Sequence, residues 1–158
     1  MRAHFFDPVK KNPNLPMARS LAYQIYRLHE AGADYSAELR QLGQLAGRII
    51  SLQQVMAAFG SISPETFARK SLVDWHSLPA DATEAEMLEM LELICQAKGT
   101  EFQVEYWVEC LRINTGDDRL SDLIFWPDEY FGKPVPQDLS AEEILDVALG
   151  RASGEHTV

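Results

Sequence analysis

The sequence contains few cysteines and histidines and no long apolar run. Its two cysteines, Cys95 and Cys110, lie within apolar helical patterns, and we expect free buried thiols rather than a disulfide. The four histidines lack the spacing of metal ligands, so neither a metal nor another cofactor is expected. No stretch of about 18 apolar residues is present to span a membrane. The first residues also lack the basic-then-apolar pattern of a signal region. These absences favour a cytoplasmic protein.

Patterns that mark an active site are also missing. The chain has no Gly-rich phosphate loop and no Ser/His/Asp set. Acids recur about every three residues between Glu84 and Glu92, which is the usual polar face of a solvated helix. Catalytic carboxylates need burial or a charged partner to shift their pKa, and the sequence indicates neither. We therefore expect a protein that is not an enzyme.

Charge is distributed unevenly along the chain, whose net charge is −10. Residues 1–76 hold nine Lys/Arg and six Asp/Glu, a net charge of +3, whereas residues 77–158 hold five and eighteen, a net charge of −13. Such an acidic segment repels nucleic acid and attracts a basic partner. The simpler alternative is a soluble acidic surface. Either way, the asymmetry suggests two different modules.

In the first module, residues 1–76, apolar residues at helical spacing predict helices, and glycine and proline residues mark where they begin and end. Prolines at 8, 13 and 16 predict an irregular lead-in over residues 1–16. Four helices are then expected: Met17 to about Ala31, a second capped by Ser36 and closing near Gly47, Leu52 to about Phe59 after a Ser51 cap, and Pro64 to about Leu72 after Ser63.

Three capping boxes organise the second module, residues 77–150. They are Thr83–Glu86, Thr100–Gln103 and Ser140–Glu143, and they predict helices running to Gly99, to Ile113 and to Leu149. A short element over Asp122–Trp126 precedes a loop over residues 127–136, and residues 151–158 read as a frayed tail. No strand pattern occurs. The prediction is an all-α protein, with a small acidic four-helix domain preceded by an N-terminal helical extension.

Residues 36–60 offer an alternative function, because helix, glycine-bearing turn and helix form the outline of a helix-turn-helix. A DNA-binding regulator would insert the second helix into the major groove. That helix has no Lys or Arg, although phosphate contacts from basic residues dominate affinity for DNA. Packing into a small bundle is the simpler interpretation. A purely structural or scaffold protein that has only the four-helix pattern is a third possibility.

Two features suggest a protein-binding surface in the second module. The helix from Thr100 carries apolar residues on more than one face, so its second row is covered either by the N-terminal extension or by a partner, with Glu101, Glu105 and Glu109 as rim charges. Phe125 and Trp126 are adjacent, and neighbouring side chains do not share a helix face. Either Phe125 or Trp126 should therefore reach the surface beside carboxylates, as in a binding hot spot.

The motifs of this module occur in a recognisable order: Thr83-Glu84-Ala85-Glu86, Ile94-Cys95, an acidic helix, Ser121-Asp122-Leu123-Ile124-Phe125-Trp126-Pro127 and a last helix. Over about residues 80–150 they resemble the nuclease colicin and pyocin immunity proteins. This resemblance implies an inhibitor that binds a DNA-cleaving bacteriocin domain beside its active site and excludes DNA by bulk and negative charge.

The resemblance also implies the contacts. The short third helix would anchor the toxin through Asp122, Phe125 and Trp126, and the second helix would select the toxin near Val104, Glu105 and Val108. The implied partner is a basic nuclease toxin domain, with an HNH-type DNase as one candidate, and neither a membrane nor nucleic acid is expected. In the family, two tyrosines stand at the positions of Phe125 and Trp126, and neither aromatic of this chain has their hydroxyl group. The N-terminal extension of about 75 residues has no counterpart in the family.

Overall fold

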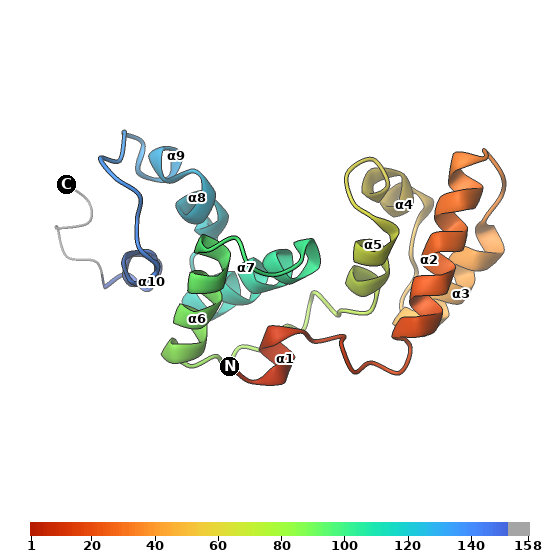
Figure 1. Cartoon of the computed structure of the whole chain (residues 1–158), viewed down its shortest axis with the longest axis horizontal. Coiled ribbons are helices and arrows are strands. Elements are labelled where there is room, and N and C mark those ends of the chain that lie inside the picture. The colour runs from red at the N-terminus through yellow and green to blue at the C-terminus, as the bar shows by residue number, and fades with distance from the viewer. Residues whose placement is uncertain (152–158) are drawn as a thin grey trace. The chain divides into compact units, whose positions relative to one another are not determined.

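A computed structural model describes residues 1–151, which form ten α-helices and no β-strand (Figure 1). The predicted all-α class is confirmed. None of the helices in this range is long and apolar enough to cross a membrane. Residues 152–158, most of the predicted tail, lie outside the described residues.

The chain divides into two compact units. The N-terminal unit is Asp7–His76, and the C-terminal unit joins Met1–Phe6 to the chain from Ser77 onward. The first six residues, which the sequence placed at the start of the extension, are thus grouped with the C-terminal unit. That 1–76 and 77–150 are separate domains stays a prediction.

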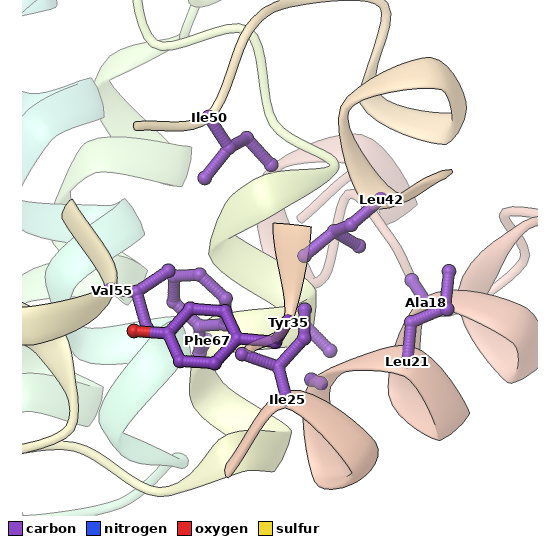
Figure 2. Close-up of a cluster of buried hydrophobic side chains, with 10 residues drawn as sticks. Ala18, Leu21, Ile25, Tyr35, Leu42, Ile50, Val55 and Phe67 are labelled. Carbon is purple, nitrogen blue, oxygen red and sulfur yellow. The ribbon is translucent and has the colours of Figure 1, made fainter. Parts of the chain in front are cut away.

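Four helices form the N-terminal unit: α2 (Leu15–Glu30), α3 (Ser36–Ala46), α4 (Leu52–Ala58) and α5 (Pro64–Ser71). Helix α2 packs against α3 and α5 because its apolar residues recur at three- and four-residue spacing. Figure 2 shows the resulting core, which consists of Ala18, Leu21, Ala22, Ile25, Tyr35, Leu42, Ile50, Val55, Phe67 and Ala68.

The helix starts of this unit follow local hydrogen bonds. Ser51 and Gln54 form a reciprocal capping box, and Ser63 caps α5 ahead of its first-turn proline. The predicted Ser36 cap is wrong, because Tyr35 occupies the cap position and makes no side-chain cap bond. Ser36 instead donates its backbone N–H and its hydroxyl to Asp34 Oδ1, at 3.1 and 2.5 Å.

The C-terminal unit contains α1 (Ala3–Phe6), α6 (Glu84–Cys95), α7 (Glu101–Thr115), α8 (Leu120–Phe125), α9 (Pro127–Phe131) and α10 (Ala141–Ala148). All three predicted capping boxes are present. Helix α6 packs against α7 and α10, and α7 packs against α1 and α8. The buried face of α6 consists of Glu86, Met87, Met90, Leu91 and Ile94.

Several boundaries differ from the prediction: α1 lies within the predicted irregular lead-in, α7 ends at Thr115 rather than at Ile113, and α8 begins at Leu120 rather than at Asp122. Helix α6 ends at Cys95 rather than at Gly99, because Ala97 adopts a left-handed conformation (φ 55°) and Lys98 N–H closes the turn on Leu93 O at 2.9 Å. Part of the predicted loop after Pro127 is helix α9, since proline is well suited to the first position of a helix.

Both cysteines are free thiols, as predicted, but only one is buried. Cys110 lies in the core, and burial raises the pKa of its thiol to about 11. Cys95 is exposed, so the prediction that it is buried is wrong. It is the last residue of α6, one position past Ile94, the last residue on the buried face of that helix.

Helix α7 is apolar on two sides, and α1 covers part of the second side. The Trp107 indole N–H donates to Phe5 O at 2.8 Å, Tyr106 OH donates to His4 O at 2.9 Å and Gln103 Nε2 donates to Phe6 O at 3.1 Å. Phe5 and Trp107 are both buried. Side chains of α7 thus donate hydrogen bonds to three consecutive backbone carbonyls of α1.

Glu86 was predicted to be a solvated acid, and this is wrong. Its carboxylate is buried and accepts bonds from Arg2 Nη2, Nε and backbone N–H at 2.7, 3.0 and 2.9 Å. Hydrogen bonds from Arg2, with a further one from Thr83 N–H, hold the pKa of Glu86 well below its usual range. Sequence patterns do not reveal this pair, because 84 residues separate its members.

This pair predicts a pH-dependent stability. A carboxyl whose pKa is depressed on folding stabilises the protein above its unfolded pKa and loses that effect as the pH falls. Thermal unfolding between about pH 7 and pH 3 should therefore show Glu86→Gln less stable than the wild type at neutral pH, with the gap narrowing below about pH 4.5. Glu84→Gln, an exposed acid on the same turn, is the control and should change the unfolding midpoint little. A gap independent of pH would contradict the assignment.

Candidate functional site

A groove of about 610 Å³ lies on the C-terminal unit between α7, α8 and the end of α6. We call it the α7–α8 groove. Its lining residues are Ile94, Ala97, Gly99, Glu101, Val104, Glu105, Val108, Glu109, Ser121 and Phe125. Four of the six predicted site residues, Val104, Glu105, Val108 and Phe125, are therefore brought together. They come from two helices, at positions up to 21 residues apart.

The apolar part of the groove follows from helix geometry. Val104 and Val108 are four residues apart on α7 and lie on one face, with Val108 buried and Val104 half-buried. Phe125 ends α8 and is 45% exposed. Because α8 buries Leu120 and Leu123, its terminal aromatic is left at the surface beside the two valines. The groove thus offers an apolar surface that is accessible to a partner.

The acidic part of the groove is a row of three glutamates. Glu101, Glu105 and Glu109 are spaced four residues apart on α7, so they follow one side of that helix. Glu109 accepts bonds from the Arg112 guanidinium at 3.0 and 3.1 Å. The groove therefore combines an apolar surface with excess negative charge, which suits an apolar side chain flanked by Lys or Arg.

Asp122 and Trp126 lie on the α8 side but do not line the groove. Asp122 Oδ2 is 3.6 Å from Arg119 Nε, and Asp122 O accepts the Trp126 backbone N–H at 2.7 Å. Trp126 separates α8 from α9 and is 61% exposed. The prediction that one aromatic of the pair reaches the surface is exceeded, since both do. Phe125 therefore lines the groove, and the exposed Trp126 follows it directly in the chain.

Gly99 shapes the far end of the groove. Its φ of +95° favours glycine, and a Cβ there would lie 2.7 Å from the Trp107 ring. Trp107 thus packs directly behind the groove. The sequence pattern indicated Gly99 only as a helix breaker. It gave no sign that Ile94, Ala97 and Ser121 line a groove. A glycine directly before a capping box was the one available signal of a close approach.

The residues of the groove are suited to binding a partner. Among residues 1–151 no group of three His, Cys, Asp or Glu side chains could hold a metal ion. A strongly shifted tyrosine pKa occurs outside the groove: burial, with a further effect of Asp117, raises the pKa of Tyr130 to about 12. Tyr130 OH donates to Asp117 Oδ2 at 2.8 Å, and Arg119 lies over its ring, so Tyr130 serves to hold α9.

The decisive comparison is with known protein families. Residues 80–150 match the colicin immunity protein / pyocin immunity protein family. This match confirms the resemblance drawn from the sequence motifs, over the same residues. It includes the whole α7–α8 groove together with Asp122 and Trp126.

The immunity-family match supports a bacteriocin immunity function with a bacteriocin toxin as partner. Immunity proteins of this family are generally not enzymes. Neither the curated proteins nor the solved structures gave a significant match to the chain. The N-terminal unit lies outside the matched residues.

Proposed function

We propose that this chain is an immunity protein that binds and inhibits a nuclease bacteriocin through the α7–α8 groove and the adjoining aromatics. The observation that carries the proposal is the groove itself, in which Val104, Val108 and Phe125 adjoin a row of glutamates within the family-matched residues. An apolar centre with a charged rim is the usual anatomy of a tight protein interface.

The aromatic pair supplies the centre of the proposed interface. Phe125 and Trp126 are 45% and 61% exposed, and large exposed aromatics at adjacent positions are uncommon unless a partner covers them. Asp122 lies one helical turn before them. Although it is near Arg119, it is half-buried rather than enclosed, so a toxin Lys or Arg could compete for it.

Charge supports a basic toxin. The C-terminal unit has six Lys/Arg and eighteen Asp/Glu, a net charge of −12. A nuclease that binds DNA presents cationic surface to phosphates, and such a surface is attracted by this unit and steered towards it. An inhibitor bound beside the active site then excludes DNA by bulk and like charge. An HNH-type DNase is the toxin class that the resemblance suggests.

The alternative of a DNA-binding regulator receives no support from its own residues. The proposed reading helix is α4, and it presents Leu52 and Met56 at the surface without any basic side chain. Affinity for DNA comes mainly from Lys and Arg at phosphates. A gel shift of duplex DNA at low ionic strength that weakens as salt is added would support DNA binding.

The proposal is tested by first identifying the cognate nuclease domain among the neighbouring reading frames, and then titrating it with the full chain while DNA cleavage is measured. Cleavage should stop at equimolar inhibitor. Glu105→Lys should slow association about three- to tenfold at low salt, because rim charges act on the association rate. Glu142→Lys, an exposed acid on α10, is the control and should have a smaller effect. Full cleavage in the presence of excess chain would refute an inhibitory role.

A further inference from the structure

Helix α4 in the N-terminal unit carries an exposed apolar stripe. Ile49, Leu52 and Met56 are 92%, 53% and 58% exposed, and their spacing of three and four residues places Leu52 and Met56 on one side of the helix, with Ile49 just before it. Val55 is the one residue of α4 that is buried. A seven-residue helix has little stability alone and depends on packing against other elements. The exposed stripe is apolar surface of α4 that could be buried in such a contact.

A concave apolar surface adjoins this stripe. A second groove, of about 720 Å³, is lined by Tyr35, Leu39, Gly43 and Ile50 and shares Ile49 and Leu52 with the stripe. We call it the α3–α4 groove. Convex apolar side chains and an apolar hollow thus lie next to each other. This is the arrangement that a two-fold interface requires, in which one copy fills the groove of the other and is filled in turn.

The charges around this surface favour a second copy over other partners. No charged residue occurs between Arg48 and Glu65, so the stripe itself carries no repulsion. The N-terminal unit has eight Lys/Arg and six Asp/Glu, a net charge of +2, against −12 for the rest of the chain. Two copies of a chain with a net charge of −10 therefore meet with least repulsion at this unit.

The rim of the groove is complementary to itself. It carries Arg40 and Arg48 together with Asp34, which is exposed and ionised, since its hydrogen bonds from Ser36 lower the pKa of its carboxyl. A purely acidic or purely basic partner would face one like charge there. A second copy brings charges of both signs to this rim, so its aspartate can face the arginines of the first copy.

We propose that the chain forms a homodimer in which the Ile49–Leu52–Met56 stripe of each copy occupies the α3–α4 groove of the other. This interface is independent of the α7–α8 groove and of any toxin. It gives the N-terminal unit, which the family match does not include, the task of joining two toxin-binding units.

Sedimentation velocity of the full chain over a range of concentrations tests the proposal. The wild type should approach twice the monomer mass of 17.8 kDa. Met56→Glu should weaken dimerisation about tenfold or more, because it places a charge inside an apolar contact. Met17→Glu is a matched control, since Met17 is 57% exposed on α2, outside the stripe, and its variant should remain dimeric.

Leu52→Glu provides a second variant if Met56→Glu lowers helicity by circular dichroism. A wild type that stays monomeric at every accessible concentration overturns the proposal. Equal loss of the dimer in Met17→Glu, or a dimer insensitive to both α4 variants, also overturns it by placing the contact elsewhere.

Discussion

Trp107→Ala is expected to destabilise the C-terminal unit by about 3–5 kcal/mol, the usual cost of truncating a buried tryptophan. The side chain is 1% exposed, donates its indole N–H to Phe5 O at 2.8 Å and lies against Gly99. Its removal opens a cavity behind the α7–α8 groove and leaves the Phe5 carbonyl without this donor. Urea unfolding followed by circular dichroism measures the loss.

Trp107→Phe is a milder truncation, because it keeps a six-membered aromatic ring although it also loses the indole donor and part of the buried volume. Its cost should be clearly smaller than that of the alanine variant. If Trp107→Ala unfolds with the wild-type midpoint, Trp107 is not a buried contact between α7 and α1, and this account of the C-terminal unit is wrong.

Trp126→Ala is expected to weaken toxin binding while leaving the stability of the protein unchanged, in contrast to Trp107→Ala. We expect a loss of about 2–4 kcal/mol in binding free energy, or roughly 30- to 1000-fold in Kd, as for a central hot-spot residue. The reason is its position, 61% exposed between α8 and α9 and next to Phe125. Calorimetric titration with the nuclease domain measures the change.

The two tryptophans serve as controls for each other. Trp126→Ala should unfold within about 0.5 kcal/mol of the wild type, because exposed side chains contribute little to stability. A Trp126→Ala protein that loses its helicity would show this residue to be core and would refute its role as an anchor. Undiminished affinity in a folded variant would place the anchor elsewhere.

Local signals predicted the starts of α4, α5, α6, α7 and α10, which are half of the helices in the described residues. The boxes at Thr83, Thr100 and Ser140 depend on residues three positions apart, so one sequence window contains the whole interaction. Errors at helix ends arose where a stop signal was ambiguous. Pro127 ends α8 but also begins α9, and Ala97 ends α6 in a conformation usually reserved for glycine.

Long-range contacts could not be predicted in this way. The coverage of α7 by α1 joins residues about a hundred positions apart, and the burial of Glu86 depends on Arg2. A helical pattern shows that Glu86 lies near a polar face but not that an arginine meets it there. The groove was partly foreseen, since the family resemblance indicated Val104, Val108 and Phe125, whereas Ala97 and Gly99 carried no pattern of binding residues.

The most direct test of the α7–α8 groove as the toxin-binding surface is amide hydrogen exchange of the full chain, with and without its cognate nuclease domain. We predict slower exchange in the bound state within residues 94–109 and 120–126 and little change in α4. Tight binding that leaves those two segments unprotected, or that protects α4 instead, would contradict the account.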